Sequence, residues 1–250
     1  SNDELKNAVT KKPFLGFSDT TLNHFMLHKV GLPTFYGQAF LPDVCELAPE
    51  MLPYTKRYFE EFLKTGTIRE VRPSELWYTS RTDFSPEALG TELPAHKNTG
   101  FELLQGSVQF EGEILGGCID SMYEMFSGWR YGDMPEVCRN YGLFPSMDDW
   151  RGKILLMESC EEYMPPETYK KALETLQETG VFDAVSGVLV GKPMDDMYHA
   201  EYKKLLVETI SNKELPILCN INVGHAQPRC ILPFGVPAHV DADAQVIRFD

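Results

Sequence analysis

Apolar residues in the second half of the chain follow two alternating patterns. Continuous apolar runs at 153–158, 184–191 and 215–224 have the length and composition of strands that are buried on both faces. Between them, 165–180 and 195–212 carry apolar residues at helical spacing, and the first of these has Pro near its start and Gly at its end. Alternation of strand and helix predicts an α/β fold with a mostly parallel, helix-covered sheet.

The first 65 residues show the same patterns in shorter form. Residues 14–17 form a short apolar run that predicts a strand, and 20–30 predict the helix that follows it. Residues 32–40 predict a second short strand with a loop, and 54–64 predict another helix. This part therefore also has an α/β pattern.

The periodicity weakens between about residues 66 and 100, where three prolines and several Ser and Thr residues occur. This composition predicts a linker or an excursion over the surface. After it, 101–117 predict two strands with Gly turns, and 128–150 predict an irregular insertion. We expect a first part over 1–65, a crossover over 66–95 and a second part over 96–250.

Charge and cysteine usage narrow the class of protein. The formal net charge is −14, and nucleic-acid binding needs cationic patches, so we expect no nucleic-acid partner. No apolar run reaches the roughly 18 residues of a membrane span, and we recognise no signal segment, so we expect no membrane contact and a cytoplasmic protein. The six cysteines include no C-x-x-C pair, which favours reduced thiols.

Two histidines were considered as metal ligands. His24 and His28 lie four residues apart on the predicted helix, a spacing that can bind a metal. No Glu follows His24 directly, and no third ligand is evident. We therefore expect surface or partly buried histidines, no metal site and no other cofactor.

Three polar residues follow predicted strands directly. Ser18 follows the first strand, Glu158 ends the strand at 153–158, and His225 follows the strand at 215–224. Taken singly, Ser18 is a helix cap, Glu158 is the end of a strand and His225 is a loop residue. Taken together, they supply a nucleophile, an acidic orienter and a base at the strand ends, where α/β proteins bind ligands.

The chemistry explains why these residue types belong together. A serine hydroxyl is a poor nucleophile at neutral pH and needs a neutral imidazole to accept its proton. A carboxylate on the other ring nitrogen fixes the tautomer and stabilises the imidazolium. The order Ser, Glu, His is also that of α/β-hydrolase triads.

Four stretches resemble the LD-carboxypeptidases of the S66 serine peptidases, in the right order across most of the chain. They are KPFLGFSDTT, GEILGG, KILLMESCEE and NVGHAQPRCILPFG. The resemblance implies that Ser18 is the nucleophile and that the Asp19 N–H binds the oxyanion. It also implies Glu158 and His225 as the other members of a catalytic triad, with Gly116 and Gly117 binding substrate.

The implied architecture is that of a two-part serine hydrolase. Residues 1–65 would be a partial nucleophile domain, and 96–250 a domain carrying the Glu and the His. The family has a longer segment before the nucleophile, which supplies a second oxyanion N–H. We expect either that another segment of the same protein completes the sheet beside residues 14–17, or that this apolar edge pairs with a second copy. We expect a homodimer.

The chain departs from the family pattern at two further positions. Cys118 follows the Gly-Gly segment where Asn is usual, which removes a substrate hydrogen bond. Gln38 stands where the family has Pro in a Tyr-Gly-Pro segment.

The crossover indicates which substrates to expect. PSELWYTSRTDF resembles a Trp-bearing loop of microcin-immunity-like members, in which an aromatic residue stacks on a nucleobase. Trp77 is the candidate for this stacking role, and Trp129 or Trp150 could take its place. The alternative for Trp77 is a hydrophobic plug between domains.

The implied reaction is hydrolysis of an amide bond next to a free carboxylate, in a small murein LD-peptide or an aminoacyl-nucleotide. The alternative is a non-catalytic binding or regulatory paralogue with the same cleft.

Overall fold

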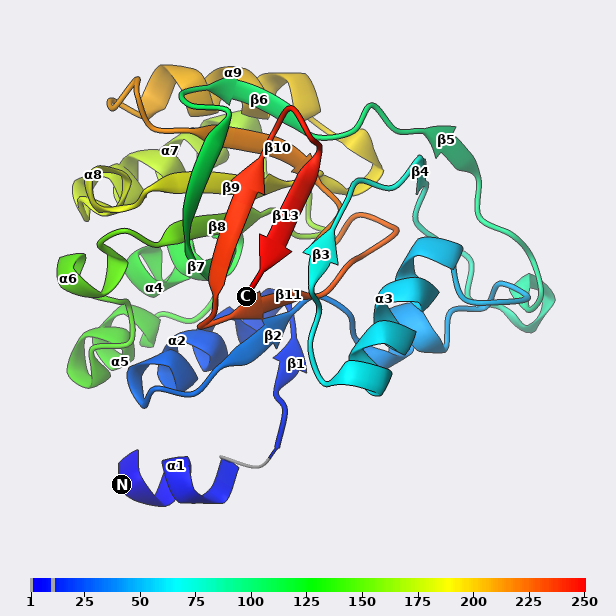
Figure 1. Cartoon of the computed structure of the whole chain (residues 1–250), viewed down its shortest axis with the longest axis horizontal. Helices are drawn as coiled ribbons and strands as arrows, with labels where there is room; N and C mark the ends of the chain where they lie inside the picture. Colours follow the sequence, from blue (N-terminus) through cyan, green and yellow to red (C-terminus); the bar gives the residue numbers. More distant parts are fainter. Residues whose placement is uncertain (1, 10–11) are drawn as a thin grey trace.

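The computed structural model of the protein describes residues 2–9 and 12–250, and its main body is an eight-stranded mixed sheet (Figure 1). The strand order is β3-β13-β12-β7-β8-β9-β10-β6, and the four central strands run parallel. These four are β7 (Gln109–Cys118), β8 (Ile154–Glu158), β9 (Gly187–Gly191) and β10 (Ile217–Ile221). The α/β fold class predicted from the alternating pattern is confirmed.

Both ends of this sheet are antiparallel, which the apolar runs did not indicate. The flanking strands are β12 (Pro237–Asp241), β13 (Val246–Phe249), β3 (Glu70–Val71) and, at the other edge, β6 (Glu102–Gln105). The long strand β7 joins the antiparallel part of the sheet to the parallel part. Its first half, to Glu113, pairs antiparallel with β12, and its second half, from Ile114, pairs parallel with β8.

Helices cover the sheet and fill much of the region expected to be irregular. The helices are α4 (Ile119–Ser127), α5 (Met134–Tyr141), α6 (Met147–Trp150), α7 (Pro166–Glu178), α8 (Val181–Ala184) and α9 (His199–Thr209). The prediction of an irregular insertion over 128–150 was therefore wrong, because this segment contains α5 and α6. Their signals are local: Ser146 and Asp149 form a capping box on α6, and α5 ends at Gly142 in a left-handed conformation.

A second, three-stranded sheet carries the first predicted strand. Its strands are β1 (Leu15–Gly16), β2 (Thr34–Tyr36) and β11 (Leu232–Phe234), in the order β1-β2-β11. Helix α2 (Thr21–Lys29) connects β1 to the parallel strand β2, while β11 is antiparallel. Within the described part of the chain β1 is an edge strand, and helix α1 (Asn2–Val9) lies at the margin of the molecule (Figure 1).

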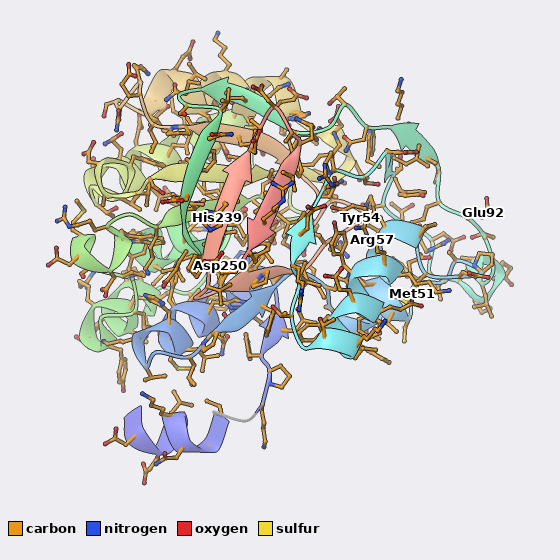
Figure 2. The ribbon with its side chains drawn as sticks, in the orientation of Figure 1. Met51, Tyr54, Arg57, Glu92, His239 and Asp250 are labelled. Atoms are coloured by element: carbon orange, nitrogen blue, oxygen red, sulfur yellow. The ribbon has the colours of Figure 1, made fainter. Side chains whose placement is uncertain are left out.

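The crossover packs against helix α3 (Pro53–Thr65). It forms a separate ribbon of β4 (Leu76–Tyr78) and β5 (Ala95–Lys97). Figure 2 labels Tyr54 and Arg57 on α3, and the Tyr54 hydroxyl donates a hydrogen bond to the Arg72 carbonyl at 2.6 Å. Because β3 joins the main sheet and β11 joins the small one, the chain crosses between the two sheets more than once.

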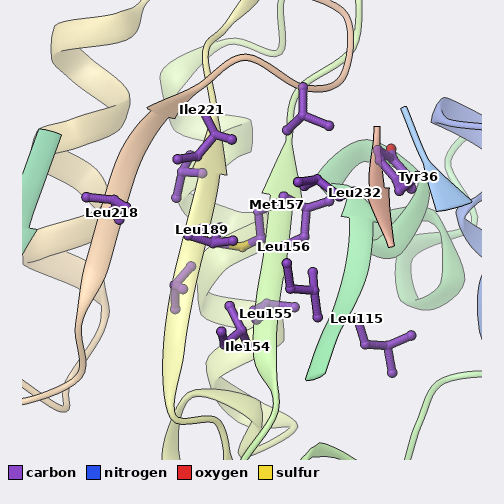
Figure 3. Packing of buried hydrophobic residues seen from close by; sticks show 14 of the residues in the cluster. Tyr36, Leu115, Ile154, Leu155, Leu156, Met157, Leu189, Leu218, Ile221 and Leu232 are labelled. Carbon is purple, nitrogen blue, oxygen red and sulfur yellow. The ribbon is translucent and has the colours of Figure 1, made fainter. Parts of the chain in front are cut away.

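The core lies where the two sheets meet. In Figure 3, Leu155, Leu156 and Leu189 lie on the parallel strands of the main sheet. Tyr36 and Leu232, from the small sheet, belong to the same hydrophobic core. All five side chains are fully buried. No helix in the described ranges combines the length and the apolar character that crossing a bilayer requires.

Candidate active site

Ser18 stands on a sharp turn between strand β1 and the helices that follow. A 3-10 turn (Ser18–Thr20) runs directly into α2, and Ser18 has φ = +63°, which is uncommon for a residue other than glycine. Gly16 permits this close turn, because a Cβ there would stand 2.7 Å from the Thr20 Oγ1. The turn presents the Ser18 hydroxyl at the end of the strand.

His225 and Glu158 meet Ser18 from the other side of the site. The His225 Nε2 lies 3.0 Å from the Ser18 Oγ, and its Nδ1 lies 2.7 Å from Glu158 Oε2. Glu158 ends the central strand β8, and His225 lies in the loop after β10. The predicted grouping of the three residues therefore appears in the fold as one series of hydrogen bonds.

Glycine makes the contact between the loop and the carboxylate possible. Gly224 has φ = +88°, and a Cβ there would stand 2.3 Å from Glu158 Oε2. The backbone N–H of His225 also donates to this oxygen, at 3.2 Å. Glu158 is buried, and the two donors of His225 both contact its Oε2 atom.

Tyr36 links the two sheets at the site and was missed in the sequence. Its hydroxyl donates to Glu158 Oε1 at 2.6 Å and accepts the backbone N–H of Ser18 at 3.1 Å. Tyr36 is fully buried, and burial, followed by the charge of Glu158, raises its pKa well above the usual value, so the hydroxyl stays protonated as a donor. The sequence indicates Tyr36 only through its position in an apolar strand, two residues before Gln38.

A second carboxylate also reaches the imidazole. Glu161 Oε2 lies 3.0 Å from His225 Nε2, the same nitrogen that faces Ser18. Glu161 is 60% exposed in its side chain, so it approaches from the solvent side, unlike the buried Glu158. The sequence reasoning did not single it out, although it lies three residues after Glu158.

The charges around His225 set its protonation state. Burial lowers the pKa of the imidazole, but the charge of Glu158 and contacts with Glu158 and Glu161 outweigh this and raise it to about 10. Contact with His225 lowers the pKa of Glu161 to about 2. The arrangement therefore holds an imidazolium between two carboxylates.

A cleft of about 710 Å³ opens in front of Ser18 and His225. Its other lining residues come from the turn after β1, the segment after β2, the crossover and the loops after β8, β9 and β10: Phe17, Leu41, Pro42, Cys45, Glu46, Leu47, Ser80, Arg81, Phe84, Glu161, Met194, Gln227 and Arg229. Phe17 packs edge-on against the His225 ring at 4.9 Å between ring centres. The cleft is large enough for a small organic substrate.

The predicted oxyanion donor lies in the backbone directly after Ser18. The Ser18 N–H is engaged by Tyr36, whereas the Asp19 N–H belongs to the first turn of a helical segment. Such N–H groups lack partners within the helix and attract negative charge. The role of Asp19 as an oxyanion donor stays a prediction.

The two glycines of the GEILGG segment lie inside strand β7. A Cβ on Gly117 would stand 2.4 Å from Thr21 Oγ1, and one on Gly116 would stand 2.1 Å from the Leu156 carbonyl oxygen. Both therefore permit close packing behind the site, and neither is among the residues that line the cleft. Their substrate-binding role stays a prediction.

The tryptophans occupy different environments. Trp150 is 1% exposed and packs against Phe25 and Phe144, so its proposed role at the cleft was wrong: its ring is part of the core. Trp129 is 56% exposed. Trp77 stacks on His96 at 4.1 Å between ring centres and is not among the residues that line the cleft.

The residues do not favour a metal site. His24 is buried, and its two ring nitrogens contact Thr34 Oγ1 and the Gly16 carbonyl. Cys118, Glu158 and His225 place ligand atoms within 4.8 Å of one another. However, burial raises the pKa of the Cys118 thiol, and both other groups are engaged in the hydrogen bonds described above. All six cysteines are free thiols.

Comparison with known proteins shows which family the chain belongs to. Residues 111–240 match the LD-carboxypeptidase C-terminal domain of the S66 peptidases. The chain belongs to the LD-carboxypeptidase family. It is 27% identical over 248 residues to the microcin C7 self-immunity protein MccF of Escherichia coli, covering 95% of this chain and 65% of that protein. The chain thus spans about 65% of the length of this relative.

Solved structures of family members agree with the fold. An MccF-like protein from Streptococcus pneumoniae in complex with AMP is 58% identical, with a TM-score of 0.97 over 100% of this chain and 73% of the other. MccF in complex with aspartyl sulfamoyl adenosine is 25% identical, with a TM-score of 0.77 over 100% of this chain and 70% of the other. The resemblance predicted from the four motifs is confirmed.

Proposed function

We propose that the protein is a serine hydrolase that cleaves an amide bond next to a free carboxylate through Ser18, His225 and Glu158. The observation that carries the proposal is the series of contacts from the Ser18 Oγ to His225 Nε2 and from Nδ1 to Glu158. This geometry meets the requirement that nucleophile and base lie within hydrogen-bond reach.

The first half of the proposed reaction acylates the serine. The Ser18 Oγ attacks the substrate carbonyl carbon, and the hydroxyl proton passes to His225 Nε2 as the new C–O bond forms. The Asp19 N–H stabilises the resulting oxyanion. When this intermediate collapses, the C–N bond breaks and the leaving nitrogen takes the proton from Nε2.

The second half repeats these steps with water. Water attacks the acyl carbon and gives a proton to His225, and the Ser18 Oγ leaves with that proton as the acyl–oxygen bond breaks. Glu158 remains ionised and supports the imidazolium in each half. No cofactor takes part in this scheme.

Two substrate classes fit the proposal, and the relatives favour one. An aminoacyl-nucleotide is supported by the AMP complex of the 58% identical MccF-like protein and by the aspartyl sulfamoyl adenosine complex of MccF. A murein LD-peptide is supported by the LD-carboxypeptidase family itself. Trp77, or the 74% exposed Phe84 of the cleft, would stack on the nucleobase.

The direct test compares hydrolysis of a murein LD-tetrapeptide and an aminoacyl sulfamoyl adenosine. We expect cleavage of at least one, and a loss of about 10⁴-fold or more in kcat for Ser18→Ala, because the variant lacks the attacking oxygen. Activity retained in that variant would refute the mechanism.

One observation favours a second function, a binding module without turnover. Glu161 contacts the same His225 nitrogen that must accept the serine proton. If that contact were permanent, the cleft would bind ligands without cleaving them. Ligand binding measured by calorimetry, with no product from either substrate, would support this alternative.

A further inference from the structure

The contact between Glu161 and His225 is incompatible with the first step of the reaction. A carboxylate 3.0 Å from Nε2 is favourable only when that nitrogen carries a proton. The attack by Ser18 requires an unprotonated Nε2 that can accept the hydroxyl proton. Glu161 must therefore leave the imidazole before Ser18 can react, and its exposed carboxylate is then free to take another cationic partner.

Other charged groups in the cleft do not offer that partner. The Arg229 guanidinium is 5% exposed and bonds to Asp43 Oδ1 at 2.9 Å and to two carbonyl oxygens. Arg81 is bound to Glu46 and to both oxygens of Thr91. Among the described residues that line the cleft, Glu161 is thus the carboxylate with no fixed arginine or lysine partner.

Glu162, the next residue, shows the contrasting situation. Its carboxylate pairs with Arg130 at 2.9 Å, and the same arginine lies 3.6 Å from Asp19. Glu162 is not among the residues that line the cleft. Glu161 and Glu162 are neighbours with similar exposure, but they differ in their partners. Glu162 pairs with Arg130, whereas Glu161 contacts His225 next to Ser18.

We propose that Glu161 is a specificity-determining residue that binds the free α-ammonium group of the substrate and, by moving to it, releases His225. The inference rests on the proposed function and narrows its substrate class. It favours an aminoacyl-nucleotide, because its amino acid carries a free α-ammonium group. In a murein LD-peptide the corresponding nitrogen is part of an uncharged peptide bond.

The reach of Glu161 selects the α-nitrogen. The scissile carbonyl carbon stands about 3–3.5 Å from the Ser18 Oγ in a near-attack geometry. The α-nitrogen is two bonds from that carbon, and the Ser18 Oγ and Glu161 Oε2 both lie 3.0 Å from His225 Nε2. A side-chain ammonium lies several bonds further out, beyond the atoms next to the nucleophile.

The test measures the ratio of kcat/KM between a substrate with a free α-ammonium group and one without it. An L-aminoacyl sulfamoyl adenosine is compared with its N-acetyl counterpart, which lacks the cation. We expect the protein to favour the free amine by about 10–100-fold in kcat/KM, the range expected for one charged hydrogen bond. Glu161→Gln should reduce that ratio to near one, and Glu161→Asp should restore part of it.

Glu162→Gln is the matched control, since it removes the same charge one residue away and should keep the wild-type ratio. An equal ratio in wild type and Glu161→Gln would overturn the inference. An N-acetyl-lysyl substrate favoured over an N-acetyl-norleucyl one would move the recognised cation to the side chain and would also overturn it.

Failure of the proposed function would give a different result. If no substrate is cleaved, the same two ligands are measured by calorimetry in the Ser18→Ala protein, with and without Glu161→Gln. Loss of the preference for the free amine in the double variant would uphold the role of Glu161 even then. Equal affinities for both ligands without the Gln substitution would reject it.

Discussion

The two sheets that meet at the site differ in how firmly they hold their part of it. Glu158 ends β8, a strand with every residue buried and a parallel neighbour on each side. Ser18 follows β1, a two-residue strand with β2 as its one paired neighbour among the described strands. Glu158 is therefore fixed by the core, whereas Ser18 depends on a short edge strand and a few polar contacts.

The surroundings of the small sheet support this contrast. An apolar cavity of about 590 Å³ lies beside β1, lined by residues that include Leu5, Phe14, Met26 and Phe35. Ser18 itself is tied down by Tyr36 on its N–H, and Thr21 Oγ1 donates to its carbonyl at 2.7 Å. The position of Ser18 is thus set by hydrogen bonds from β2 and α2 more than by burial of the preceding strand β1.

After Ser18→Ala, the largest predicted effect is the loss of the charge of Glu158, on the firmly held side. Glu158→Gln should lower kcat by about 10³–10⁴-fold, because the amide cannot stabilise the imidazolium. This loss should be smaller than that of Ser18→Ala. Steady-state kinetics on both variants provide the comparison, and a greater loss for Glu158→Gln would mean that it does more than orient His225.

Stability should differ between the two sheets. Leu156→Ala, in the fully buried centre of the main sheet, should cost about 2–5 kcal/mol in the free energy of unfolding. Leu15→Ala, in the partly buried edge strand β1, should cost about 1 kcal/mol. Urea unfolding measures both, and equal costs would show that the edge strand is held as firmly as the core.

Tyr36 is the residue whose loss should couple the two sheets. Tyr36→Phe removes the hydroxyl that joins Glu158 and the Ser18 N–H, and should lower kcat by about 10–100-fold, as for a lost hydrogen bond to a charged group. A double-mutant cycle with Glu158→Gln should show that the two losses are not additive. Additive losses would mean that Tyr36 acts on Ser18 alone.

The smallest effect concerns pH. The free protein holds His225 as an imidazolium with a pKa raised to about 10, so kcat/KM should rise with pH until the ring is neutral. Glu158 and Glu161 favour the charged ring, while burial and Arg229 oppose it. Glu161→Gln removes one favourable contact, so the rising limb of the pH profile should move to lower pH. A shift to higher pH would contradict this account.

The sequence predicted the elements and the three central side chains because their signals are local. Apolar runs marked β8, β9 and β10, and the polar residues at the ends of strands pointed to Ser18, Glu158 and His225. The family resemblance rested on motifs around the same residues. These features depend on neighbours in the chain and can be read from one segment at a time.

The missed features depend on contacts between distant segments. Tyr36 reaches Glu158 across 122 positions, and no pattern near either residue indicates this hydrogen bond. Glu161 looked like one acidic residue among many, because only the fold places it on His225. Trp150 was misread for the same reason, since an aromatic residue in a polar stretch can point into the core.

The most direct test of the account is labelling of Ser18 by a fluorophosphonate probe, read out by mass spectrometry of the intact protein and its peptides. The account predicts one adduct, located on Ser18, that is absent in Ser18→Ala and strongly slowed in His225→Ala. Absence of labelling in both the folded wild-type protein and the Glu161→Gln variant, or labelling that persists in Ser18→Ala, would contradict the claim that Ser18 is an activated nucleophile.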